Sequence, residues 1–298
     1  MRMLVTGSSG LVGSALVKQM SHGGREVVRL VRREPQLDAN EVGWDPAAGT
    51  IDAAAMEGCQ AAVHLAGESV AGRWTAAKKA RIRDSRVEGT RLLAEALAGL
   101  AHPPSVLACA SAIGVYGDRA DEELTEESEP GEGFLADVCR DWEAAAEPAA
   151  AAGIRVAHLR FGIVLSRRGG ALARMLGPFC FGLGGVLGSG RQWWSWVALD
   201  DVLAAIEHVL ATETLGGPVN VAAPHPVTNR EFTRTLGRVL RRPTFFWVPG
   251  GLARLALGQM ADEMLLASAR VLPRRLLDTG FSFRHPDLEG ALRAAVRS

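Results

Sequence analysis

Several residue types are scarce in this chain, and each scarcity excludes a class of protein. There are 298 residues but a single tyrosine, Tyr116, and only three lysines, Lys18, Lys78 and Lys79. The four cysteines lie far apart and form no C-x-x-C pair, which argues against a zinc site and against a disulfide framework. Positive and negative charges cancel, so no overall basic field can hold nucleic acid or an anionic membrane, and any anion site must be local.

The sequence also lacks long apolar runs. No uninterrupted stretch approaches the roughly 18 apolar residues expected of a membrane span. The N-terminal MRMLVTGSSG leads directly into an apolar strand and a glycine turn, without the features of a signal peptide. We therefore expect a cytoplasmic protein with no membrane partner. The zero net charge and the isolated cysteines likewise predict no nucleic-acid partner and no metal ion, and the chain is expected to be monomeric or homodimeric.

Short apolar segments alternate with segments of helical spacing through the first half of the chain. Strands are expected at residues 3–6, 26–31, 61–67, 105–111 and 155–165, with helices between them. This rhythm is typical of parallel βαβ units, and with 48% hydrophobic residues the chain can bury a substantial core. The predicted fold class is α/β, with a Rossmann-type doubly wound parallel sheet.

The rhythm stops near residue 166, where a region rich in glycine and tryptophan begins. We expect residues 1–168 to form the nucleotide-binding domain, with residues 197–222 returning to it. Residues 169–196 and 223–298 are expected to form a smaller, mainly helical C-terminal substrate lobe.

Three glycines follow the first strand in the pattern T-G-x-x-G-x-x-G. Such a turn lets backbone N–H groups approach a pyrophosphate at the positive end of the next helix. A glycine triplet alone is weak support, since an ordinary strand–helix turn can carry one, but its place in the first βα unit favours a nucleotide site. The expected cofactor residues of this turn are Gly7, Ser8, Ser9, Gly10, Leu11, Val12 and Gly13.

The end of the second strand bears on the choice between the two nicotinamide dinucleotides. Folds that prefer NAD usually have an Asp or Glu there that binds the ribose hydroxyls, whereas this chain has Arg32 and Arg33. Guanidinium groups suit a 2′-phosphate. We therefore predict NADP(H) as the cofactor, with a solvated arginine pair as the alternative interpretation.

Longer strings carry a more specific signal. The run TGSSGLVG, the HLAG that ends a later strand, and Ser111 followed by VYG resemble the extended short-chain dehydrogenase/reductase superfamily. The strings LAGESVAGRWTAAKKARIRDSRVEGT, FLADVCRDWE, GLGGVLGSGRQWWSWVALDD and RVLPRRLL resemble its atypical, epimerase-like branch, the NAD(P)-dependent epimerase/dehydratase-like proteins. This resemblance spans essentially the whole chain.

The resemblance implies further cofactor contacts. They are Leu65, Ala66, Gly67 and Glu68 beside the cofactor, Asp45 near the adenine, and Arg160, Phe161, Gly162 and Ile163 along the nicotinamide. Arg86 takes the place of an asparagine that commonly faces the cofactor in the extended group. Asp45 can also be interpreted as part of a turn, and Arg86 as a charge on a helix surface.

The same resemblance makes the scarcity of tyrosine and lysine informative. Hydride-transfer enzymes of this superfamily use a serine, a tyrosine that moves the proton, and a lysine four residues later that lowers the tyrosine pKa. On the helix that reads GFLADVCRDWE, these last two positions fall on Leu135 and Cys139, or on Phe134 and Val138 in the neighbouring register. Neither register supplies a proton donor and a cation, so the standard mechanism is in doubt.

Ser111 and Tyr116 are the candidate catalytic residues, because both lie at the C-terminal edge of a central strand, where α/β sheets bind ligands. Ser111 would hydrogen-bond a carbonyl, and Tyr116 would be a substitute acid, although it fits equally well as a packed loop aromatic. Cys139 is better explained as a space-filling residue than as a nucleophile, because no histidine lies near it in the sequence.

Two pairs of arginine and tryptophan are the candidate substrate contacts. Arg191 and Trp194 lie where the substrate lobe of the family meets the nucleotide domain, and Arg73 and Trp74 form the second pair. Such groups can clamp an anionic or planar ligand, while core packing is at least as good an explanation for the tryptophans. Two hypotheses follow. The protein is an NADP(H)-dependent oxidoreductase or epimerase-like enzyme of an unknown small-molecule substrate that can be anionic, or a non-catalytic NADP(H)-binding regulator that senses redox state.

Overall fold

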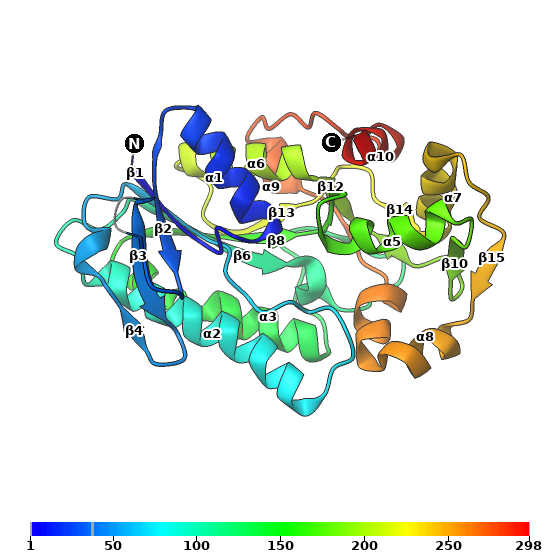
Figure 1. The fold of residues 1–298 in the computed structure, drawn as a ribbon, viewed down its shortest axis with the longest axis horizontal. Coiled ribbons are helices and arrows are strands. Elements are labelled where there is room, and N and C mark those ends of the chain that lie inside the picture. The colour runs from blue at the N-terminus through cyan, green and yellow to red at the C-terminus, as the bar shows by residue number, and fades with distance from the viewer. Residues whose placement is uncertain (1, 37–38, 298) are drawn as a thin grey trace.

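The central sheet fixes the position of the candidate sites. The computed structural model describes residues 2–36 and 39–297, and its eight-stranded sheet has the order β13-β8-β6-β5-β1-β2-β3-β4 (Figure 1). The strands are β1 (Arg2–Thr6), β2 (Glu26–Val31), β3 (Glu41–Asp45), β4 (Thr50–Ile51), β5 (Ala61–His64), β6 (Val106–Ala112), β8 (Arg155–Phe161) and β13 (Gly217–Val221). All neighbours run parallel except β3 and β4. The predicted Rossmann-type α/β class is confirmed.

The central strands are apolar along their length because both faces of the sheet are covered. Met3, Leu4 and Val5 of β1 are fully buried, and every residue of β5 is buried. The sequence pattern does not predict β3, because Glu41 and Asp45 stand at its ends and it has no apolar run.

Helices lie on both faces of the sheet (Figure 1). One face carries α1 (Leu11–His22), α6 (Leu199–Ala211) and the short α9 (Arg274–Asp278), and the other carries α2 (Ala76–Ala98), α3 (Phe134–Ala144) and α4 (Glu147–Ala151). Each side has its own apolar core. Within the described part of the chain, no helix is long and apolar enough to cross a membrane.

The remaining elements lie to the right of the sheet in Figure 1. The helices are α5 (Gly170–Cys180), α7 (Asn229–Leu240), α8 (Gly250–Leu257), a π-helical turn (Ala261–Leu266) and α10 (Leu288–Arg297). The strands form pairs: β9 (Ile163–Leu165) with β12 (Trp196–Ala198), β10 (Gly185–Leu187) with β15 (Phe246–Val248), β11 (Trp193–Trp194) with β14 (Val227–Thr228), and β7 (Glu123–Leu124) with β16 (Arg270–Val271). A third core holds most of this region together.

Two features join this C-terminal part to the nucleotide-binding half. β13 forms the edge of the central sheet beside β8. In addition, the Glu263 carboxylate accepts hydrogen bonds from the amides of Phe134 and Leu135 at 3.1 and 2.7 Å. A residue of the π-helical turn therefore caps the N-terminus of α3.

Candidate nucleotide-binding and active site

The glycine turn is packed too closely to hold side chains at two of its positions. Gly7 has a φ of 65°, and a Cβ there would lie 2.6 Å from the backbone carbonyl of Leu65. A Cβ on Gly13 would lie 2.2 Å from the Gly7 oxygen. The first turn of α1 contains no acidic residue, so its positive N-terminus is not neutralised from within the helix. This arrangement suits the close approach of a pyrophosphate.

Thr6, at the end of β1, holds the neighbouring strand exit in place. Its hydroxyl oxygen accepts hydrogen bonds from the amides of Leu65 and Ala66 at 3.1 and 3.2 Å. The proton of the hydroxyl is therefore directed to His64 Nδ1, which lies 2.8 Å away. Burial lowers the pKa of His64 to about 4, so the ring is neutral at physiological pH. Sequence reasoning missed this pair, although a threonine and a histidine that end two apolar strands are a usable signal.

The two arginines after β2 have different surroundings. Arg33 lies 2.6 Å from the buried Glu41 carboxylate, which also pairs with Arg29 at 2.9 Å. Arg32 is exposed, and its side chain has no hydrogen bond or ion pair with any other residue in 2–36 or 39–297. It is close enough to Glu68 to contribute to lowering that carboxyl's pKa, an effect in which the hydrogen bond from Lys78 is largest. Arg32 is thus the better placed of the two to bind a phosphate.

A second cation lies between the exit of β5 and α3. Arg86 donates from Nη1 to the carbonyl of Glu68 at 3.0 Å, and its guanidinium lies 4.9 Å from the Trp142 ring. It also lies 3.4 Å from the point where a Cβ of Gly67 would be. Lys78 Nζ approaches Glu68 Oε1 to 2.5 Å. Arg86 is therefore a half-buried, fixed charge at the expected cofactor site, not a solvated charge on a helix surface.

A buried ionic network lies at the carboxyl ends of β6 and β8. Arg160 donates from Nε and Nη2 to the two oxygens of Glu143, both at 2.8 Å. Ser111 Oγ donates to the same carboxylate at 2.6 Å. Burial would raise the pKa of Glu143, but the hydrogen bonds from Arg160 and Ser111 outweigh it and hold that pKa below its ordinary value. The expectation that Arg160 runs along the nicotinamide is corrected, because its guanidinium is buried and bound to Glu143.

Tyr116 is fully buried, at the end of a short 3₁₀ turn. Its hydroxyl lies 2.9 Å from the carbonyl of Thr125 and 2.8 Å from Asn220 Oδ1, and it accepts from Arg160 Nη1 at 2.9 Å. Burial raises the pKa of this phenol. The expectation that Tyr116 is a substitute acid is therefore corrected, and the alternative of a packed aromatic describes it better.

We expect Tyr116→Phe to lower the stability of the protein and to leave turnover, where present, nearly unchanged. Loss of the hydroxyl removes a hydrogen-bond partner from two buried groups, Arg160 and Asn220, at a cost of about 1–3 kcal/mol. Urea unfolding of the wild type and the variant measures the difference. Unchanged stability together with a turnover loss of about 10² or more would restore Tyr116 as an acid.

α3 supplies neither the proton donor nor the cation of the usual pair. Leu135 packs against the chain at Gly114, and Cys139 is buried. Burial raises the pKa of the Cys139 thiol to about 12, so it stays protonated, in keeping with a space-filling role. Phe134 and Val138, the positions of the other register, belong to an apolar cluster.

The candidate substrate residues divide into two groups. Trp74 packs edge-on against Phe134 and donates to the Val70 carbonyl at 2.7 Å. Trp194 is 4% exposed and packs against Phe232. The expectation that these tryptophans contact a ligand is corrected, because both are core residues.

The two arginines of these pairs remain at the surface. Arg73 donates to the carbonyl of Leu255 at 3.4 Å, which links the segment before α2 to α8. Arg191 is exposed, and its side chain has no hydrogen bond or ion pair with another described residue. Arg191 is therefore the stronger candidate for an anionic ligand.

The other expected cofactor residues lie at the same edge of the sheet. Asp45, at the end of β3, accepts from the amides of Ala47 and Ala48 at 3.0 and 3.3 Å, as in the turn interpretation. After Phe161 ends β8, the amide of Gly162 donates to the carbonyl of Val221 in β13 at 3.0 Å, and the amide of Ile163 donates to the carbonyl of Ser195, just before β12, at 2.8 Å. The backbone there is fixed, while Phe161 and Ile163 are only half-buried.

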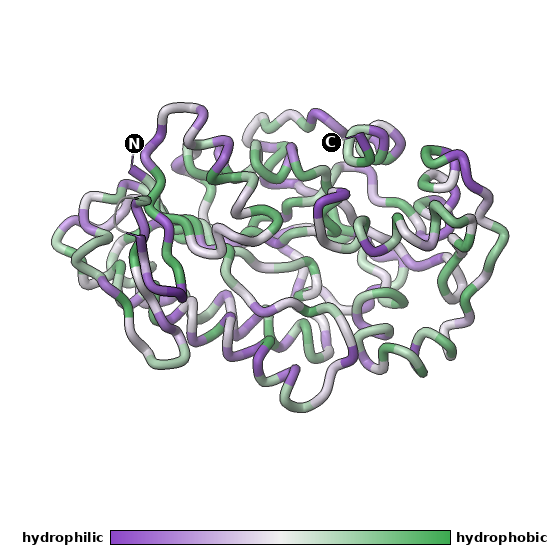
Figure 2. Tube along the Cα trace, viewed as in Figure 1, coloured by the Kyte–Doolittle hydropathy of each residue, from purple (hydrophilic) through white to green (hydrophobic). Residues whose placement is uncertain are grey.

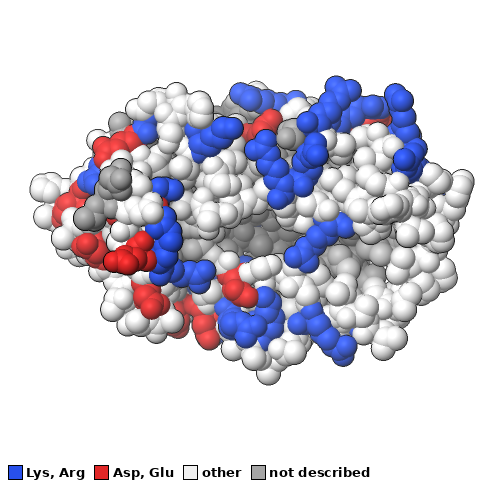
Figure 3. Space-filling model, viewed as in Figure 1, with Lys and Arg blue, Asp and Glu red and all other residues white. Residues whose placement is uncertain are grey.

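The molecular surface is hollowed between the nucleotide-binding half and the C-terminal part (Figure 3). Lysine and arginine side chains gather on several sides of the rim. A hollow with a basic rim suits an anionic ligand such as a dinucleotide.

A parallel Rossmann-type sheet, a close-packed glycine turn and a basic exit of β2 together define a dinucleotide-binding protein. The model of the NAD dependent epimerase/dehydratase family matches residues 3–222, and a domain of unknown function, DUF1731, matches residues 248–295. The chain belongs to the NAD dependent epimerase/dehydratase family.

Relatives match over nearly the whole chain. An epimerase family protein of Mycobacterium bovis is 43% identical over 98% of this chain and 96% of its own length. The human epimerase family protein SDR39U1 is 35% identical over 99% of this chain and 100% of its own length. A crystal structure of human SDR39U1, isoform 2, with NADPH superposes with a TM-score of 0.91 and 34% identity over 100% of both chains.

Proposed function

We propose that the protein is an NADP(H)-dependent oxidoreductase or epimerase-like enzyme that acts on a small, anionic substrate without a tyrosine–lysine pair. The observation that carries the proposal is the exposed Arg32 at the end of β2, beside a glycine turn that accommodates a pyrophosphate. The crystal structure of human SDR39U1 with NADPH supports the same cofactor.

The chain's own residues have separate parts in this proposal. The glycine turn and Arg32 bind the phosphates, and Arg86 supplies a fixed cation in place of the one missing at the usual lysine position of α3. When bound, the nicotinamide supplies hydride transfer. The Ser111 hydroxyl donates a hydrogen bond to Glu143, so its oxygen is left as an acceptor and orients a substrate hydroxyl rather than polarising a carbonyl. Arg191 binds the substrate anion.

A non-catalytic, NADP(H)-binding regulator is the second candidate. It is favoured because Tyr116, Ser111 and Glu143 are hydrogen-bonded within one buried network. No described side chain of that network is left free to donate a proton to a substrate. In this case the cofactor's oxidation state would be read by the C-terminal part.

NADPH consumption with a panel of carbonyl compounds, and NADP⁺ reduction with the corresponding alcohols, distinguishes the two functions. An enzyme gives turnover that Arg86→Met lowers more than Arg86→Lys does, because lysine keeps the charge. Tight NADPH binding without turnover on either panel favours the regulator. Gly13→Ala is the control without cofactor binding, since its Cβ would collide with the Gly7 oxygen. Failure of the wild type to bind either cofactor would overturn both.

A further inference from the structure

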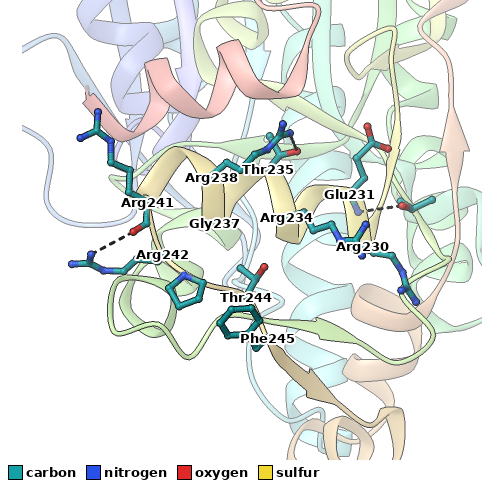
Figure 4. Close-up of a pocket in the computed structure, with 12 residues that line it drawn as sticks. Arg230, Glu231, Arg234, Thr235, Gly237, Arg238, Arg241, Arg242, Thr244 and Phe245 are labelled. Carbon is teal, nitrogen blue, oxygen red and sulfur yellow. Dashed lines mark hydrogen bonds between the residues drawn. The ribbon is translucent and has the colours of Figure 1, made fainter.

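Arginines form a row along the outer face of α7 and the two residues that follow it. An open groove of about 930 Å³ follows this face, and Figure 4 shows the side chains that line it. Five of its lining residues are arginines, and Glu231 is its acidic one. The arginines are Arg230, Arg234, Arg238, Arg241 and Arg242. The groove therefore has a strong local positive charge, although the whole chain has a net charge of zero.

Few of these charges are neutralised within the molecule. Arg238 lies 3.6 Å from Glu289, at the limit of an ion pair. Arg230 and Arg242 donate only to backbone carbonyls. The guanidinium groups of Arg234 and Arg241 have no hydrogen bond or ion pair with another residue in the described part of the chain. The groove is therefore complementary to an anionic partner outside the molecule.

Large apolar side chains protrude beside the groove. Phe245, which lines it, is 91% exposed, and Phe181 is 84% exposed. The loop that carries Phe181 lies against the start of the segment that carries Phe245, because a Cβ on Gly182 would be 3.8 Å from Pro243 Cγ. Trp247 follows in β15 and is 65% exposed. Below the basic side chains at the upper right, the right-hand end of the molecule is almost free of charged side chains in Figure 3, and β15 and α8 are largely apolar in Figure 2.

We propose that this end of the molecule docks on an anionic phospholipid surface. The arginines of the groove bind headgroup phosphates, and Phe181, Phe245 and Trp247 enter the interfacial layer, where aromatic side chains are favoured. The expectation of no membrane partner was based on the net charge of the whole chain. A net charge of zero does not reveal a local surface with strong positive charge.

Two other occupants fit the surface less well. A second copy related by twofold symmetry would bring the two arginine rows together, and like charges repel. A single-stranded nucleic acid would stack its bases on the aromatic rings. However, Leu183, Leu252 and Leu255 are also between 56% and 73% exposed, and aliphatic side chains offer no stacking face. Acyl chains contact both kinds of side chain.

Co-sedimentation of the full chain with lipid vesicles tests the proposal. Vesicles of phosphatidylcholine alone are compared with vesicles that contain phosphatidylcholine and phosphatidylglycerol in roughly equal amounts. We expect binding to the anionic vesicles only, and weaker binding as salt is raised. No binding, or equal binding to both kinds of vesicle, would overturn the proposal.

Two double variants and one control separate the contributions. An arginine near the surface contributes about 1 kcal/mol, or about fivefold in affinity, so Arg234→Glu with Arg241→Glu should weaken binding by about 25-fold or more. Phe181→Ser with Phe245→Ser should also weaken it. Lys18→Glu with Arg91→Glu, exposed positions on α1 and α2, makes the same change in net charge and should bind like the wild type.

Two results would assign the surface to another partner and overturn the proposal. In the first, the wild type binds single-stranded RNA and the arginine variant does not, while neither of these two proteins binds vesicles. In the second, the wild type is a dimer in solution and the phenylalanine variant is a monomer. Each variant is checked for folding. It should bind NADPH as tightly as the wild type does, and its circular dichroism spectrum should be unchanged.

Discussion

Replacement of Glu143 by alanine is expected to lower the free energy of unfolding by about 3–5 kcal/mol. The substitution leaves the Arg160 guanidinium buried without its carboxylate and removes the acceptor of the Ser111 hydroxyl. The side chains of Arg160 and Glu143 are only 7% and 15% exposed, so water replaces the lost partner poorly. Urea unfolding at neutral pH measures the effect.

Asp141→Ala is the matched control on the same helix. Asp141 pairs with Arg83 at 2.9 Å, but both side chains are exposed, so its loss should cost about 0–1 kcal/mol. Equal losses in the two variants would mean that the buried Glu143 carboxylate stabilises the fold no more than an exposed ion pair does.

The stabilisation by Glu143 should also depend on pH. Because the pKa of Glu143 is lower in the folded protein than its ordinary value of 4.5, the stabilisation is fully present above that value. It is lost as the pH falls through the folded pKa. The difference in stability between the wild type and Glu143→Ala should therefore narrow only in the acid range.

Replacement of Arg32 by alanine is expected to remove most of a preference for NADPH over NADH. A charge-assisted hydrogen bond contributes about 1.5–3 kcal/mol, so NADPH affinity should fall by about 10- to 150-fold while NADH affinity stays nearly constant. The pyrophosphate contacts of the glycine turn are the same for both cofactors, which is why NADH is spared. Calorimetric titration with each cofactor measures the preference, which should also shrink with added salt.

Arg33→Ala is the paired comparison for this prediction. Its guanidinium is bound to Glu41, so its removal should affect NADPH much less than removal of Arg32 does. Tighter binding of NADH than of NADPH by the wild type would contradict the cofactor assignment. A larger effect of Arg33→Ala would contradict the division of roles between the two arginines.

Local patterns in the sequence were enough to predict the sheet and the glycine turn. β1, β2 and β6 are short strands made mostly of apolar residues, and close packing at Gly7 and Gly13 follows from the spacing of the glycines. β3 was not predicted because it is short and has polar residues at both ends. It lies next to the edge strand β4.

The errors at the candidate site have one physical cause. Tyr116, Trp74 and Trp194 have amphipathic side chains that suit either a ligand or a core, and only tertiary packing decides between the two. Arg160 was misplaced for a related reason, since its partner Glu143 is 17 residues away in sequence and comes from a different element. Arg32 and Arg33 are alike in the sequence. They differ in the structure because Arg33 is paired with Glu41, eight residues away.

The position of β13 has a practical consequence for anyone who wishes to divide this protein. A fragment that ends at residue 168 would lose the strand that covers β8 and would expose an unpaired strand edge with the apolar residue Leu159 beside it. The same fragment would lose Glu263, the cap of α3. Truncation at the apparent domain boundary should therefore yield an aggregating polypeptide, and only the whole chain is a sensible unit for expression or for fusion to another protein.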